Sequence, residues 1–158
     1  MPGRPGKPFP KALNLEDGRG VSFVRVLVVD DYEPFRRFIC SMLGTQPDLQ
    51  VVCEVSDGLE AVQKAKELQP DLIVLDIGLP GLNGIEAARR IRQLSPLSKI
   101  LFVSQQSSAD VVQEALSFGA LGYVVKAQAA AEFLTAVATV LLDKQFVGGN
   151  LLDGDGHH

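Results

Sequence analysis

Five polar side chains in this sequence each follow a short apolar segment. The pair Asp30 and Asp31 follows VRVLVV, Asp76 follows DLIVL, Ser104 follows KILFV and Lys126 follows LGYVV. Such short, β-branched apolar runs are typical of buried strands. Three carboxylates brought into one crevice repel one another unless a cation lies between them, and an oxygen-only cluster suits a hard ion such as Mg²⁺. The sequence therefore predicts a magnesium site if the ends of these segments meet.

The pattern between these segments indicates that their ends do meet. Apolar residues recur there at the spacing of amphipathic helices, so strands and helices alternate along the chain. This alternation predicts an α/β fold with a doubly wound parallel sheet, helices on both faces and right-handed crossovers. Ligands in such sheets bind outside the carboxyl ends of the strands. We expect strands at 24–30, 50–55, 71–76, 99–104 and 121–126, and helices near 35–43, 58–68, 85–91, 109–118 and 133–141.

Length and composition limit the class of protein. The chain has 158 residues, of which 46 % are hydrophobic and 22 % charged, and this is typical of one globular domain with a real core. A net charge of −4 gives no sign of a nucleic-acid binder, which usually carries a basic excess. No apolar run approaches the roughly 18 to 20 residues that span a bilayer. Cys40 and Cys53 lie in apolar segments, and we expect buried, reduced thiols in a cytoplasmic protein.

The two ends of the chain differ from its middle. Residues 1–20 hold four of the nine prolines and almost no β-branched residues, so we expect a flexible tail there. We expect the folded domain over 21–147 and a second flexible tail over 148–158. His157 and His158 are compatible with a native end and with an expression tag, and we assign them no chemical role. Since the chain has no other histidine, a Ser-His-Asp triad or a histidine zinc site is excluded.

The same polar residues resemble those of the receiver domain of two-component response regulators, the phospho-accepting module that works with sensor histidine kinases. The resemblance rests on Asp30 and Asp31 after VLVV, on Asp76 in LIVLDIGLPGLNG, on Ser104 after ILFV, and on GALGYVVK ending at Lys126. Each motif alone is weak, but their order and spacing together are highly specific. The family implies a flavodoxin-like fold, in which a five-stranded parallel sheet has the order 2-1-3-4-5 and is covered by five helices.

The resemblance implies a role for each acidic residue. Asp76 would be the nucleophile that takes a phosphoryl group from phosphohistidine and becomes an aspartyl phosphate. Asp31 and Asp76 would bind Mg²⁺ directly, Gly78 through its backbone carbonyl and Asp30 through a water molecule. The cation would neutralise the charge of the carboxylates and the phosphoryl group, which is most of what phosphoryl transfer asks of a protein.

It also implies roles for the residues around the phosphoryl group. Lys126 would pair with one phosphoryl oxygen, and Ser104 would donate its hydroxyl to another. Tyr123 would be a switch residue, since movement of Ser104 toward the phosphoryl group opens space for the ring to become buried. Two positions depart from the family pattern. Ala127 replaces a proline that often follows a cis bond, so we expect a trans bond there, and Gln105 replaces a small residue and is placed to cover the site.

The expected function is that of a signalling phospho-acceptor that promotes its own phosphorylation, and not that of an enzyme. Its expected partners are a sensor histidine kinase or a phosphotransfer protein, with a homodimer on phosphorylation also allowed, and neither nucleic acid nor a membrane. Two alternatives stay open: a pseudo-receiver that binds proteins without being phosphorylated, and an α/β phosphatase. A phosphatase of this kind would need a general acid two residues after the nucleophile, where this chain has Gly78.

The last third of the chain resembles receivers of the NarL/LuxR type, which usually carry a helix-turn-helix output domain. The sequence leaves no room for such a domain before it stops at His158. We therefore expect either a single-domain regulator or the receiver part of a longer protein.

Overall fold

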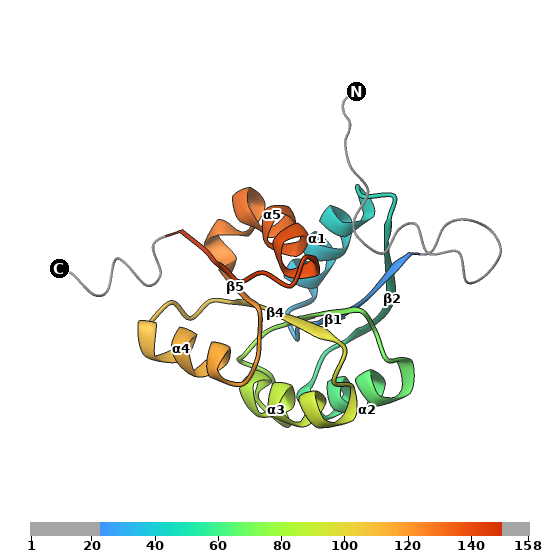
Figure 1. Ribbon diagram of the computed structural model, residues 1–158, viewed down its shortest axis with the longest axis vertical. Coiled ribbons are helices and arrows are strands. Elements are labelled where there is room, and N and C mark those ends of the chain that lie inside the picture. The colour runs from blue at the N-terminus through green and yellow to red at the C-terminus, as the bar shows by residue number, and fades with distance from the viewer. Residues whose placement is uncertain (1–22, 150–158) are drawn as a thin grey trace.

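The computed structural model describes residues 23–149, which form an α/β domain of three layers (Figure 1). The strands are β1 (Val24–Val29), β2 (Leu49–Val55), β3 (Leu72–Leu75), β4 (Lys99–Ser104), β5 (Gly122–Val125) and β6 (Phe146–Val147). The helices are α1 (Glu33–Gly44), α2 (Gly58–Leu68), α3 (Gly84–Leu94), α4 (Ala109–Ser117) and α5 (Ala129–Leu141), with a short 3-10 turn, η1 (Lys126–Gln128), before α5. The expected positions of strands and helices are thereby confirmed to within a few residues at each end.

The strands form one parallel sheet in the order β2-β1-β3-β4-β5-β6. Helices α1 and α5 cover one face of the sheet, and α2, α3 and α4 cover the other (Figure 1). The doubly wound parallel sheet is confirmed, and its first five strands have the order 2-1-3-4-5. This arrangement brings the carboxyl ends of β1, β3, β4 and β5 to one edge of the domain.

Alternating side chains of the central strands build a separate hydrophobic core on each face. Along β1, Val26 and Val28 point into the core under α1 and α5, whereas Leu27 and Val29 point into the core under α2, α3 and α4. None of these four side chains is more than 1 % exposed. A strand that is buried on both faces needs apolar residues at nearly every position, which is why β1 and β3 read as continuous apolar runs.

Local sequence signals determine where the helices begin. Asp57, Asn83 and Ser108 are the N-cap residues of α2, α3 and α4, and the side chain of each accepts a hydrogen bond from a backbone N–H of the first turn. Pro34 lies in the first turn of α1, where a missing N–H group has no cost. Because the caps of α3 and α4 end the loops after β3 and β4, they help to position the polar residues on those loops.

The sheet has one strand more than expected. The backbone N–H of Phe146 donates to the carbonyl oxygen of Leu121 at 2.9 Å, and the backbone N–H of Gly148 donates to the carbonyl oxygen of Tyr123 at 3.0 Å. A strand of two residues is too short to show a sequence pattern, so only the structure reveals it. Gly148, which we expected in the C-terminal tail, is buried at this position. The rest of that tail, residues 150–158, and the expected N-terminal tail, residues 1–20, lie outside the described part of the chain.

The two cysteines are free thiols, as expected, although both are partly rather than fully buried. Cys40 packs against the core under α1 and α5, and Cys53 packs against the core on the opposite face of the sheet. Burial, followed by the negative charge of Glu54, raises the pKa of the Cys40 thiol to about 11. This thiol therefore stays protonated and unreactive at neutral pH.

Within residues 23–149, no helix has the length and apolar character needed to cross a membrane.

A close backbone approach at Gly58 yields a stability prediction. A Cβ at this first residue of α2 would overlap the carbonyl oxygen of Leu82, in the loop before α3. Gly58→Ala should lower the free energy of unfolding by about 2 kcal/mol or more, because backbone atoms have to move apart. Gly44→Ala is the matched control, since nothing lies within 4 Å of a Cβ there, and it should be neutral or stabilising by up to about 1 kcal/mol. Urea unfolding measures both, and equal midpoints would contradict the close approach.

Candidate functional site

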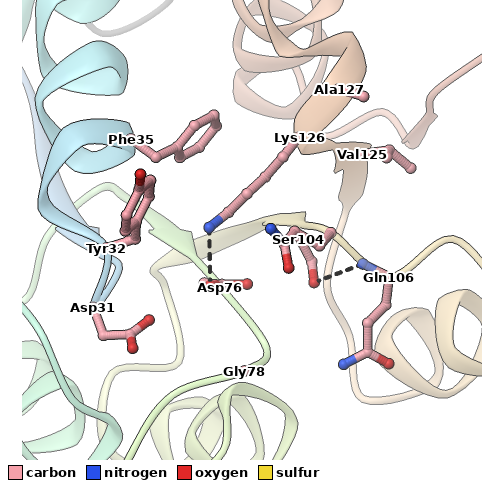
Figure 2. A pocket seen from close by; sticks show the side chains of 11 residues that line it. Asp31, Tyr32, Phe35, Asp76, Gly78, Ser104, Gln106, Val125, Lys126 and Ala127 are labelled. Atoms are coloured by element: carbon pink, nitrogen blue, oxygen red, sulfur yellow. Dashed lines mark hydrogen bonds and ion pairs between the residues drawn. The ribbon is translucent and has the colours of Figure 1, made fainter.

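The polar residues singled out in the sequence surround one pocket at the carboxyl edge of the sheet. The pocket has a volume of about 740 Å³, and five of the expected site residues line it: Asp31, Asp76, Gly78, Ser104 and Lys126 (Figure 2). These residues come from the loops that follow β1, β3 and β5 and from the last position of β4. The prediction that the ends of these strands bring the groups together is therefore confirmed.

Three carboxylates form a tight cluster at this edge. One oxygen from each of Asp30, Asp31 and Asp76 lies within 4.8 Å of the other two. Asp30 and Asp76 are only 4 % and 7 % exposed, whereas Asp31 is open to solvent. The donor atoms are all oxygens, and their three negative charges exceed the single positive charge of Lys126. These residues therefore fit a hard divalent cation such as Mg²⁺, which Asp31, Asp76 and the backbone of Gly78 would hold.

Lys126 bridges the two buried carboxylates of the cluster. Its Nζ lies 2.9 Å from Oδ2 of Asp30 and 3.2 Å from Oδ2 of Asp76. Burial alone lowers the pKa of Lys126, but the hydrogen bond to Asp30 and the charges of Asp76 and Asp30 outweigh it, so that this pKa is raised. Burial also raises the pKa of Asp30, against the opposing effects of Lys126 and of the Tyr32 backbone N–H. The lysine thus stays charged and partly compensates the buried acids.

Backbone N–H groups fix the orientation of both buried acids. Tyr32 donates to Oδ1 of Asp30 at 2.8 Å, and Ile77 donates to Oδ1 of Asp76 at 2.7 Å. In each acid, Oδ1 is therefore held by the chain and Oδ2 is turned toward the lysine. Arg36 of α1 binds the backbone of the same segment, directly after β1. Its Nη1 donates to the carbonyl oxygen of Asp30 at 2.8 Å, and its Nε donates to Glu54 of β2 at 3.1 Å.

Ser104 and Tyr123 are linked through the backbone of Gln106. The Oγ of Ser104, which is 1 % exposed, accepts a hydrogen bond from the Gln106 N–H at 3.3 Å (Figure 2). The hydroxyl of Tyr123 donates to the carbonyl oxygen of Gln106 at 2.8 Å. Burial raises the pKa of Tyr123; a hydrogen bond with Ser104 partly opposes this rise, and the negative charge of Asp76 adds to it. The Tyr123 ring is 0 % exposed, so the burial that we expected only after phosphorylation is already present in this structure.

The segment after the lysine has an ordinary backbone. All peptide bonds over residues 23–149 are trans, including the one before Ala127, as the sequence predicted. Lys126 begins η1, which leads directly into α5. Gln105 is exposed and lines the pocket beside Ser104.

Sequence reasoning missed four residues of the pocket, of which Val125 is aliphatic and the other three are aromatic or polar: Tyr32, Phe35 and Gln106. The Phe35 ring centroid lies 4.6 Å from Nζ of Lys126, but the spacing of its helix indicated only a core position. Gln106 acts through its backbone, which every residue shares, so its side chain carries no signal. Tyr32 directly follows the acidic pair, and this position is the one sequence signal that could have placed it at the pocket.

Comparisons with known proteins agree with this geometry. The family described as response regulator receiver domain matches residues 26–138. The transcriptional regulatory protein LiaR of Bacillus subtilis is 41 % identical over 115 residues, which are 72 % of this chain and 54 % of LiaR. A protein-glutamate methylesterase/protein-glutamine glutaminase of Thermotoga maritima is 41 % identical over 124 residues, which are 77 % of this chain and 36 % of that protein.

A solved structure extends the agreement to the whole fold. The crystal structure of a two-component response regulator of the LuxR family from Aurantimonas sp. SI85-9A1 superposes with a TM-score of 0.80 at 31 % identity, and the match covers 85 % of this chain and 96 % of that one. By contrast, this chain spans 54 % and 36 % of the length of the two curated relatives. The chain belongs to the family of response regulator receiver domains of two-component systems, and it is similar to the receivers of LuxR/NarL-type regulators.

Proposed function

We propose that Asp76 accepts a phosphoryl group from the phosphohistidine of a sensor histidine kinase or a phosphotransfer protein, with Mg²⁺ bound in the pocket. The observation that carries this proposal is the placement of Asp76 among two further carboxylates with Lys126 beside its Oδ2, at 3.2 Å. A cytoplasmic location is part of the proposal and is supported by the two free thiols. A homodimer that forms on phosphorylation is also part of the proposal.

The transfer makes one bond and breaks one. A carboxylate oxygen of Asp76 forms a bond to phosphorus while the bond between phosphorus and the donor imidazole nitrogen breaks. The electron pair of the broken bond stays on that nitrogen, which takes a proton from solvent. Bound Mg²⁺ would supply the positive charge that neutralises the carboxylates and the phosphoryl oxygens.

The chain itself positions the reacting oxygen and receives the new charge. The Ile77 N–H holds Oδ1 of Asp76, which leaves Oδ2 as the attacking oxygen. Lys126 already lies at that oxygen, so its ammonium group meets the phosphoryl oxygens without a large movement. Ser104 is the neighbouring hydroxyl of the pocket, and it donates to another phosphoryl oxygen once the group has arrived.

The two alternatives are less well supported by the site. A pseudo-receiver has no need of the complete set of carboxylates, lysine and hydroxyl that surrounds this pocket. A phosphatase needs a group that protonates a leaving group or activates water next to the nucleophile. Gly78, two residues after Asp76, has no side chain for this task. We therefore propose a signalling role rather than an enzymatic one.

Phosphorylation by a small donor tests the proposal directly. The full chain, incubated with Mg²⁺ and acetyl phosphate, should gain one acid-stable, base-labile phosphoryl group, measured by intact mass. Asp76→Asn should abolish the adduct, because an amide is not a nucleophile toward phosphorus. Asp110→Asn, an exposed change of the same kind in the first turn of α4, should retain it. An unmodified wild-type mass would support the pseudo-receiver, and steady release of phosphate without an adduct would support the phosphatase.

Metal binding gives a second prediction. Asp31→Asn removes one negative charge from the cluster and should weaken Mg²⁺ binding by about tenfold or more, because a hard cation depends on carboxylate charge. The fold should be retained, since Asp31 is exposed and repulsion among the acids decreases. Isothermal titration with Mg²⁺ measures the affinity, with Asp110→Asn as the control. Equal Mg²⁺ affinities for wild type and Asp31→Asn would remove Asp31 from the metal site.

The charge of Lys126 gives a prediction about pH. Lys126→Met removes the main influences that lower the pKa of Asp30, so this pKa should rise further above 3.8. An acid whose pKa is raised on folding binds more protons in the folded state, so its contribution to stability falls as pH rises through that window. The variant should lose little stability near pH 4 and about 1 to 3 kcal/mol at pH 8. Urea unfolding in EDTA across this range measures the loss, and a loss independent of pH would refute the proposed charge compensation.

A further inference from the structure

We propose that Phe35 is a positioning residue for Lys126, and that the face of its ring holds the ammonium group where the phosphoryl group arrives. The contact itself is visible in the structure, while its effect on phosphoryl transfer rests on the proposed function. No motif that identified the pocket in the sequence includes Phe35, which lies between the acidic pair and the first buried residues of α1.

The geometry is that of a cation held over an aromatic face. Nζ of Lys126 lies 4.6 Å from the centroid of the Phe35 ring, inside the range of about 6 Å over which the ring attracts a cation. Figure 2 shows the lysine side chain passing the ring on its way to Asp76. The lysine side chain is 12 % exposed, so little water screens this attraction. Phe35 and Lys126 come from opposite ends of the domain sequence, and both line the pocket.

The ring differs from the other partners of the lysine because it carries no net charge. The contacts of Nζ with Asp30 and Asp76 depend on carboxylate charges that metal binding and phosphoryl transfer both change. The ring face stays the same before and after transfer and does not compete for the metal. A lysine has a flexible four-carbon stem, so a constant contact of this kind restricts where its charge can lie.

Phe35 lies beside a second aromatic residue on α1. Its ring packs against Phe38 with the centroids 5.7 Å apart and tilted by 46°, and it also contacts the core under α1 and α5. Phe38 thus belongs to the same aromatic pair on the same helix. The ring that the Lys126 ammonium group contacts is that of Phe35. Phe38, a second phenylalanine on the same helix, therefore provides a matched control for every change at Phe35.

Fluorination of the ring separates its electronic effect from its shape. Mono-, di- and trifluorophenylalanine at position 35 progressively weaken the negative ring face while adding little volume. The initial rate of phosphorylation of the full chain by acetyl phosphate and Mg²⁺ should fall stepwise, by about fivefold or more in total. The same series at Phe38 should leave the rate unchanged. Mg²⁺ affinity should stay constant in both series, and a flat rate series at position 35 would overturn the proposal.

Substitutions by standard amino acids and an NMR measurement complete the test. Phe35→Leu should lower the rate as much as trifluorination does, whereas Phe35→Trp, which keeps an aromatic face, should restore it. In the unphosphorylated protein, the ring should shift the Lys126 side-chain CH₂ proton signals upfield, and Phe35→Leu but not Phe38→Leu should remove this shift. The absence of the shift in the wild type would overturn the contact. If the wild type accepts no phosphoryl group, the proposed function fails, and the role of the ring in transfer fails with it. The upfield shift of the Lys126 signals still shows independently whether the ring contacts the lysine.

Discussion

The uneven charge balance of the carboxylate cluster is the constraint on which the site depends. Oxygens of three acids lie within 4.8 Å of one another at the edge of an apolar sheet, and the ammonium group of Lys126 contacts the two buried acids. Such crowding is costly for buried acids unless the chain holds them in place, and it holds Asp30 and Asp76 with backbone N–H groups directly after β1 and β3. Lys126 compensates only part of the negative charge of the three acids. The charge that remains favours binding of a divalent cation at this edge of the fold.

Much of this arrangement was accessible from the sequence because its causes are local. A strand buried on both faces needs an apolar residue at nearly every position, so β1 and β3 were recognisable, and the acids after them fell at the edge where parallel strands end. The order of the strands is different. It depends on which crossovers pack best over the whole domain, and here only resemblance to a family supplied it.

What the sequence did not show acts through groups that carry no residue-type signal. Gln106 connects Ser104 to Tyr123 with its backbone N–H and carbonyl, which any residue in its place would provide. Phe35 has the spacing of a core residue, and only the fold brings it to a lysine that follows β5. Strand β6 is two residues long and forms because the chain after α5 returns alongside β5. Each depends on contacts between distant parts of the chain, which periodicity cannot encode.

The two outer strands of the sheet also bear on solubility. Parallel sheets with apolar central strands carry a risk of edge-to-edge aggregation, because an open edge presents unpaired N–H and carbonyl groups to other chains. Here β6 pairs with Gly122 and Tyr123, so the outer position is taken by a strand too short to template another. At the other margin, β2 has the exposed polar residues Gln50 and Glu54 and an irregular register with β1. Both margins thus discourage the pairing of this sheet with the sheet of another molecule.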